Sequence, residues 1–179
     1  IFDPVYNFDK NNLICLDYAS DFDLKPKNRF FIISKEDGRI VKEIQIPFKD
    51  KKTTVLTLTD AAKGITISNS ARNEELIPYF GDWLLVDPSS DTIYKSALDF
   101  SLTPFIVRTP SIQSMIPEIF LFPGVFTDRY YFLQTVKKEY NFTTDIGFPR
   151  TDLVYDRQEE AIYEYTVLNA DFSTKKLVN

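Results

Sequence analysis

The sequence contains no histidine among its 179 residues and only one cysteine, Cys15. Histidine is the commonest general base and the commonest metal ligand, so Ser–His and Cys–His catalytic pairs and histidine metal centres are excluded. Cys15 also has no second cysteine in the chain with which to form a disulfide. Because it stands between Ile14 and Leu16, we interpret it as a small buried side chain of an apolar strand.

Glycine occurs five times, too rarely for a phosphate-binding loop, and no dinucleotide fingerprint, HExxH helix or GxSxG elbow is present. The nearest approach to a calcium loop is Asp21-Phe22-Asp23, which we interpret as part of a solvated loop because the further ligand positions are missing. The sequence therefore predicts no cofactor and no metal, and it contains no recognisable catalytic motif.

Basic residues are fewer than acidic ones: the chain has 21 Lys and Arg and 26 Asp and Glu, which gives a formal net charge of −5. Proteins that bind nucleic acid usually have a basic surplus or a basic stripe, so nucleic acid is not an expected partner. No apolar run approaches the roughly 18 residues that a membrane-spanning helix needs, and we expect no membrane-spanning segment.

Aromatic residues are abundant, with 16 Phe and 10 Tyr in a chain that is 44% hydrophobic. Aromatic and β-branched side chains suit the pleated, half-buried surface of a sheet. With no long amphipathic helical pattern beside them, they predict an all-β fold.

A repeat organises this β-rich sequence, because residues 31–42, 84–95 and 153–164 align without gaps. In each segment a polar residue follows three apolar ones, and an isoleucine lies six positions after it; the polar residues are Ser34, Asp87 and Asp156. Asp and Ser at a turn start accept hydrogen bonds from nearby backbone N–H groups, so each segment predicts a β-hairpin.

Strand-like segments flank each hairpin, which makes each unit four antiparallel strands, the composition of one β-propeller blade. We place the units at about residues 12–60, 64–109 and 128–179, with a helical turn near residues 71–76. A proline-rich insertion at 110–124 is expected to be a loop with a short strand, because its prolines would break a long helix. The strand patterns at 54–59 and 65–67 are assigned to the end of the first unit and the start of the second. Three units predict a partial propeller of about three blades within a single all-β domain or fragment.

Several runs resemble an uncharacterised family of six-bladed β-propellers, exported lipoprotein-like proteins of Gram-negative gut anaerobes; the runs are 32–38, 89–94, 105–112, 128–132 and 171–176. The resemblance implies a protein about twice as long, lipid-anchored at the cell surface or in the periplasm, of which this chain would be the C-terminal half. A start at Ile1, without Met or signal peptide, leads us to expect that an upstream segment was removed.

Two other interpretations of the size stay open: a complete small β-protein, or half of a propeller completed by a second copy. Unpaired strand edges of an open half-propeller would favour self-association.

The candidate ligand-binding residues are Arg108, Arg129, Tyr130 and Tyr131. An arginine at a strand end can hold a carboxylate of a ligand in bidentate fashion, although an internal ion pair is the commoner role. The tyrosines, with Phe132, Tyr163 and Tyr165, could form a stacking platform for sugar rings or simply a blade core. Alternation along the strand places Tyr130 and Phe132 on one face and Tyr131 on the other.

The acidic turn residues Asp87 and Asp156 have the chemistry of a glycosidase pair, but we interpret each as the cap of its own turn. The hypothesis that follows is a non-catalytic cell-surface propeller module that binds a protein or a glycan. The alternative is a carbohydrate-active hydrolase or lyase with its site at the mouth of the propeller channel, and a purely structural role is a third possibility.

Overall fold

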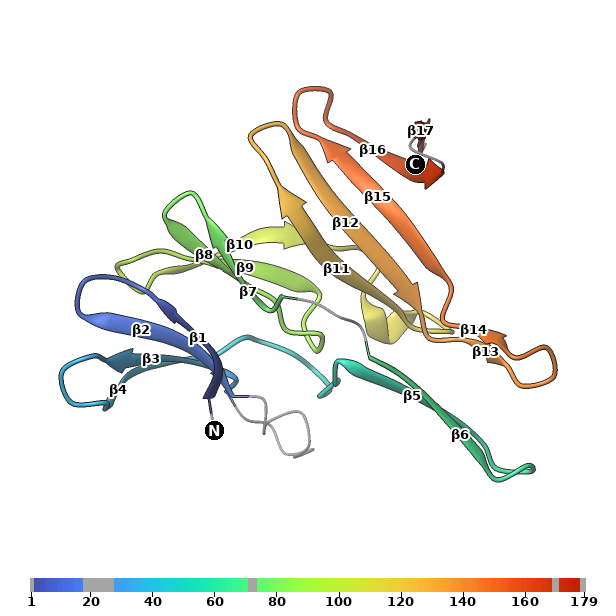
Figure 1. Cartoon of the computed structure of the whole chain (residues 1–179), viewed down its shortest axis with the longest axis horizontal. Helices are drawn as coiled ribbons and strands as arrows, with labels where there is room; N and C mark the ends of the chain where they lie inside the picture. Colours follow the sequence, from blue (N-terminus) through green and yellow to red (C-terminus); the bar gives the residue numbers. More distant parts are fainter. Residues whose placement is uncertain (1, 18–27, 71–73, 169–170, 178–179) are drawn as a thin grey trace. The chain divides into compact units, whose positions relative to one another are not determined.

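The computed structural model describes residues 2–17, 28–70, 74–168 and 171–177, and it confirms the all-β prediction (Figure 1). Within these residues the only helical element is a 3-10 turn, Ile112–Ser114. The expected loop at Asp21-Phe22-Asp23 and residues 71–73 of the expected helical turn lie outside the described residues, and Leu76 already begins a strand.

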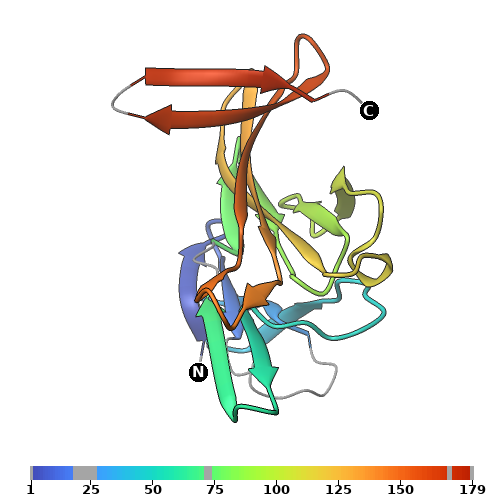
Figure 2. The ribbon, with the colours of Figure 1, turned by 90° about the vertical axis from the view of Figure 1, so that its right-hand side faces the viewer.

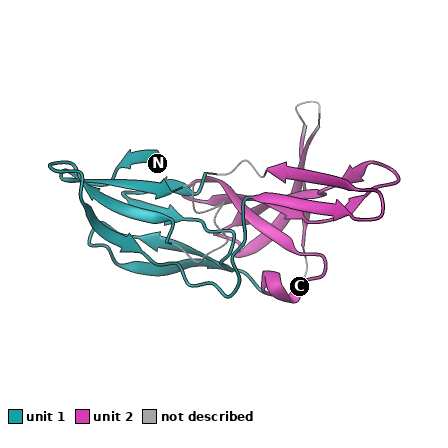
Figure 3. Cartoon of the chain, turned by 90° about the horizontal axis from the view of Figure 1, so that it is seen from below, with its two compact units in different colours: residues 1–54, 74–109 teal, residues 55–73, 110–179 magenta. Residues whose placement is uncertain are grey.

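The described residues form two compact units, residues 1–54 with 74–109 and residues 55–73 with 110–179 (Figure 3). Unit 1 contains two sheets of four antiparallel strands in sequential order. The first sheet is β1 (Phe2–Asn7), β2 (Asn12–Asp17), β3 (Phe30–Ser34) and β4 (Ile40–Ile44). The second sheet is β7 (Leu76–Tyr79), β8 (Asp82–Leu85), β9 (Thr92–Ser96) and β10 (Leu102–Val107). Both have the strand number and order of a propeller blade.

Side chains of both sheets share one hydrophobic core in unit 1, which includes Ile14, Phe30 and Ile32 from the first sheet and Trp83 and Leu85 from the second. The ring of Tyr6, in β1, lies 5.2 Å from that of Trp83. Apolar residues at alternate strand positions therefore form one face of each sheet, and these two faces pack against each other.

Unit 2 contains the third sheet, which has five antiparallel strands in the order β11, β12, β15, β16, β17. Their bounds are β11 (Ile119–Phe126), β12 (Tyr130–Lys137), β15 (Arg150–Asp156), β16 (Ala161–Leu168) and β17 (Asp171–Lys176). Two small hairpins accompany it, β5 (Val55–Asp60) with β6 (Ile65–Ser70), and β13 (Tyr140–Asn141) with β14 (Ile146–Gly147). A second core forms here around Leu56, Phe120, Phe122, Val136 and Phe148.

The three hairpins predicted from the repeat are confirmed as β3–β4, β8–β9 and β15–β16. The polar residue that starts each turn accepts backbone N–H groups as expected. Ser34 Oγ accepts the N–H of Glu36 at 3.2 Å, and Asp87 Oδ1 accepts that of Ser89 at 2.8 Å.

Two predicted groupings need correction. The strand patterns at 54–59 and 65–67 do not complete the first and second units but pair with each other as β5–β6. A short turn explains this, because Asp60 Oδ1 accepts the N–H groups of Ala62 and Lys63, and Gly64 has a φ of +65°. Local pairing through a short loop has a low entropic cost. The first sheet is completed instead by β1, which lies before the predicted unit.

The second correction concerns the predicted insertion at 110–124, which contributes most of strand β11 to the edge of the third sheet. The prolines of this segment, Pro123 among them, had predicted a loop with only a short strand. Proline is tolerated on an edge strand and at a bulge, and the β11–β12 register shifts between Pro123 and Phe126.

Strand β16 pairs with β15 only over Ala161–Glu164 and continues beyond it with β17 over Tyr163–Leu168. The β16–β17 hairpin therefore turns across the end of the third sheet (Figure 2). This arrangement leaves one face of β12 and β15 beside the hairpin, and that face contains the pocket described next.

Candidate functional site

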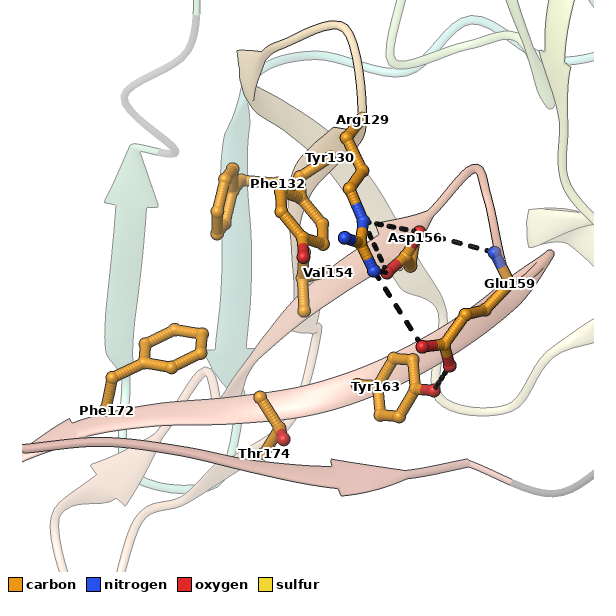
Figure 4. A pocket seen from close by; sticks show the side chains of 9 residues that line it. All are labelled: Arg129, Tyr130, Phe132, Val154, Asp156, Glu159, Tyr163, Phe172 and Thr174. Carbon is orange, nitrogen blue, oxygen red and sulfur yellow. Dashed lines mark hydrogen bonds and ion pairs between the residues drawn. The ribbon is translucent and has the colours of Figure 1, made fainter.

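A pocket of about 420 Å³ lies on the third sheet, within unit 2 (Figure 4). Strands β12, β15, β16 and β17 and the turn after β15 supply its walls. Its lining residues are Arg129, Tyr130, Phe132, Val154, Asp156, Glu159, Tyr163, Phe172 and Thr174.

Strand register explains why these side chains meet. Phe132 lies opposite Val154, which in turn lies opposite Tyr163 on the next strand. Residues directly opposite one another in antiparallel strands point to the same face. Tyr130 and Asp156 form the neighbouring row of that face, two residues along each strand. We call this side of the third sheet the pocket face.

A polar network forms one end of the pocket, centred on Arg129. Its Nε and Nη2 donate to Asp156 Oδ2 at 3.0 and 2.6 Å, and Nη2 lies 3.8 Å from Glu159 Oε1. Glu159 also accepts the hydroxyl of Tyr163 through Oε2. Asp156 keeps its turn role, since its Oδ1 accepts the N–H of Gln158 at 2.9 Å.

These contacts set the charges of the network. The hydrogen bond from Arg129 holds the pKa of Asp156 below its ordinary value. The hydrogen bond that Tyr163 donates to Glu159 raises the pKa of the phenol above its ordinary value. At neutral pH the pocket therefore presents an ionised Asp156 beside a guanidinium, with Tyr163 as a neutral phenol.

Aromatic rings form the other end of the pocket. The Phe132 ring lies 6.3 Å from that of Tyr130 and meets Tyr165 edge-on, at 5.6 Å and 84°. Tyr165 in turn stacks on Phe172 at 5.5 Å. Phe172 is 56% exposed, so a large apolar ring faces solvent at the rim.

Two of the four predicted ligand-binding residues, Arg129 and Tyr130, line this pocket. Tyr131 points to the opposite face, where it is 7% exposed and packs against Phe126 and Tyr155. The predicted separation of Tyr130 and Phe132 from Tyr131 is therefore observed.

Arg108 is not part of the pocket. It follows β10 in unit 1, and its backbone N–H donates to the carbonyl of Asp91 at 3.0 Å. Partial burial lowers the pKa of its guanidinium, an effect that the nearby charge of Asp91 opposes.

The acidic pair Asp87 and Asp156 is divided between the two units, and each carboxylate caps its own turn. The acidic partner that Asp156 meets in the pocket is Glu159, which sequence reasoning missed. Its position three residues after the turn start was a usable signal, because the turn brings it back beside Asp156. Phe172 was also missed, and its place in the pocket depends on the path of the β16–β17 hairpin.

Cys15 is fully buried in β2, and burial raises the pKa of its thiol to about 11. This agrees with its interpretation as an apolar filler. Across the described ranges, no group of three or more Cys, Asp or Glu side chains is arranged to hold a metal ion.

No helix in the described part of the chain is long and apolar enough to cross a membrane. No protein-family model, curated protein or solved structure matches this chain. The pocket itself is therefore the feature of the chain that points to a function.

Proposed function

We propose that this chain is a non-catalytic binding module that holds a glycan in the pocket of the third sheet. The observation that carries the proposal is the meeting of one arginine and two carboxylates, Arg129, Asp156 and Glu159, with the rings of Tyr130, Phe132 and Tyr163.

A sugar ring needs both kinds of group. Its hydroxyls donate to carboxylates and accept from guanidinium groups, and charge-assisted hydrogen bonds of this kind are stronger than neutral ones. Its C–H faces are apolar and gain dispersion and hydrophobic energy against an aromatic ring. In this pocket the carboxylate of Asp156 lies one row from the ring of Phe132 on the same face.

The size of the pocket favours a glycan over a protein partner. Ligand pockets for small molecules typically measure about 300–1,000 Å³, and this one measures about 420 Å³. A stable protein interface buries about 800 Å² on each partner, which would need a much broader contact surface than the nine lining side chains offer.

The electrostatics favour binding over catalysis. A glycosidase general acid needs a raised pKa so that it is protonated at neutral pH, whereas Arg129 lowers the pKa of Asp156. Glu159 shares the same arginine. Both carboxylates are thus suited to accept hydrogen bonds from hydroxyls.

The resemblance of the sequence to exported six-bladed propellers completes the proposal. It suggests a lipid-anchored protein at the cell surface or in the periplasm, where extracellular glycans are accessible. Both the family and the location are proposals that depend on the sequence runs named above.

Isothermal titration calorimetry against a panel of plant, algal and host glycans tests the function. We expect one class of glycan to bind. Tyr163→Ala should weaken that binding about tenfold, which corresponds to roughly 1.4 kcal/mol, the energy of one aromatic contact. Phe80→Ala is the matched control, because Phe80 is an exposed aromatic (67%) of unit 1. Equal loss of affinity in both variants, or no binding to any glycan, would contradict the proposal.

The second candidate is a glycan hydrolase or lyase, favoured by the presence of two carboxylates, Asp156 and Glu159, in one pocket. Chromatography of the bound glycan after long incubation separates the two functions. Binding predicts that the glycan is recovered intact, whereas catalysis predicts shorter products that disappear in Glu159→Gln.

A further inference from the structure

A second, smaller hollow of about 230 Å³ lies on the third sheet and shares Phe132 with the first pocket. Its remaining lining residues are Phe122, Pro123, Gly124, Leu133, Gln134, Asp152 and Tyr165. Gln134 lies opposite Asp152, two residues along β12 and β15 from the Phe132–Val154 row. Both therefore belong to the pocket face.

The second hollow repeats the chemistry of the first. Gln134 Nε2 donates to Asp152 Oδ1 at 2.7 Å, and Arg150 Nη1 lies 3.4 Å from Gln134 Oε1. An amide and a carboxylate thus stand side by side next to an aromatic ring, that of Tyr165. These are again planar polar groups beside an apolar ring surface.

The wall between the two hollows is aromatic. Phe132 lines both, and its ring meets that of Tyr165 edge-on at 5.6 Å. A ligand that crosses this wall would contact apolar rings in the middle and polar groups at both ends.

Strand geometry gives the reach of the combined site. Asp156 and Asp152 are four residues apart on β15 and point to the same face, which separates their Cα atoms by about 13 Å. The distance follows from a strand rise of about 3.3 Å per residue. It is longer than a single sugar ring and accommodates roughly two sugar residues.

The charges of the combined site select against acidic sugars. Among the lining residues, Arg129 is already engaged by Asp156 and Glu159, and the second hollow adds the carboxylate of Asp152. The cations Arg150 and Lys176 lie near Gln134 and Tyr163 but do not line either hollow. A uronate or sulfate group would be repelled by these carboxylates, whereas neutral hydroxyls would find acceptors at both ends.

We propose that the ligand is a neutral oligosaccharide of at least two sugar residues, one at the Arg129–Asp156 end and one at the Gln134–Asp152 end, with Phe132 between them. This inference depends on the proposed glycan-binding function.

Calorimetry with one homologous series of neutral saccharides, from mono- to tetrasaccharide, tests it. We expect affinity to rise about tenfold or more from the monosaccharide to the disaccharide or trisaccharide. Gln134→Ala should weaken the binding of the disaccharide and longer sugars and so reduce the gain in affinity with length. Tyr163→Ala should weaken binding at every length.

The same titrations distinguish failure of the subsite from failure of the function. Glycan binding that is independent of length, or unaffected by Gln134→Ala and Gln134→Glu, overturns the second subsite alone. Tighter binding of a uronate-containing disaccharide than of its neutral counterpart overturns the charge argument. Absence of binding to every saccharide overturns the glycan function and the subsite together. Circular dichroism of each variant verifies that the sheet is intact.

Discussion

Arg129 holds Asp156 through two nitrogens, Nε and Nη2, both directed at Oδ2 at 3.0 and 2.6 Å. The pair joins the start of β12 to the end of β15, and Arg129 Nη2 also lies 3.8 Å from Glu159 Oε1. A turn residue of the sequence repeat is thereby incorporated into the candidate binding pocket.

The Arg129–Asp156 pair predicts a specific pH dependence of stability. Because the pKa of Asp156 is depressed in the folded chain, its stabilisation is fully present above the ordinary carboxyl pKa of about 4 and is lost as the pH falls through the lower, folded value. The difference in free energy of unfolding between the wild type and Arg129→Gln should therefore shrink on acidification. Urea unfolding between pH 7 and pH 2 measures it, and a difference that stays constant to pH 2 would contradict the assignment.

A buried ion pair in unit 1 predicts a large loss of stability. Arg29 Nη2 and Glu75 Oε2 lie 2.6 Å apart, with side-chain exposures of 0% and 2%. Removing one partner of a buried pair is strongly destabilising, so Glu75→Ala should lower the free energy of unfolding by about 3–5 kcal/mol.

Fluorescence of Trp83, the single tryptophan and a core residue of unit 1, reports this unfolding. Arg39→Gln is the control, because Arg39 pairs with Asp37 at 3.4 Å with 86% of its side chain exposed, and its loss should cost less than about 1 kcal/mol. Equal effects of the two substitutions would show that burial does not determine the strength of the Arg29–Glu75 contact.

Cys15 should be chemically inert in the folded chain. With a pKa of about 11, about one thiol in a thousand is ionised at pH 8, and the thiolate is the reactive form. An aromatic disulfide reagent should label the chain only after denaturant is added. Rapid labelling of the native protein would show that β2 opens, which can be verified with hydrogen exchange.

The outer edge of β17 predicts self-association. No strand among the described residues pairs with this edge, and Val167 on the adjacent strand is 62% exposed. Unpaired edges attract other strands, and charged side chains discourage this pairing; β17 has two lysines at its C-terminal end, Lys175 and Lys176, so we expect only weak association. Sedimentation velocity should show a concentration-dependent dimer that weakens in Val167→Lys. A strictly monomeric wild type at all concentrations would contradict the prediction.

Local patterns accounted for the hairpins because their determinants are close in sequence. The polar starters Ser34, Asp87 and Asp156 and the isoleucines six positions later predicted three turns that the structure contains. The same reasoning misplaced the strand pair 54–59 and 65–67, because strand propensity does not specify which strand is the partner. It expected only a short strand within the 110–124 insertion and did not place β11 in the third sheet, where an edge position tolerates Pro123.

The candidate site was only half predictable for a similar reason. Alternation along β12 separated Tyr130 from Tyr131 correctly, since side chains of a strand point to opposite faces in turn. Nothing in that alternation indicated which face would remain open. Glu159 and Phe172 enter the pocket through a turn and a hairpin path that no local pattern specifies.

The sequence by itself determined the all-β class, the hairpin repeat, the acidic charge and the absence of histidine chemistry, because composition and short-range spacing decide these properties. The tertiary structure alone decided that Arg129, Asp156 and Glu159 share one pocket with a row of aromatic rings. Residues from four strands meet there through the pairing register of the third sheet, and register is a property of long-range hydrogen bonding and side-chain packing.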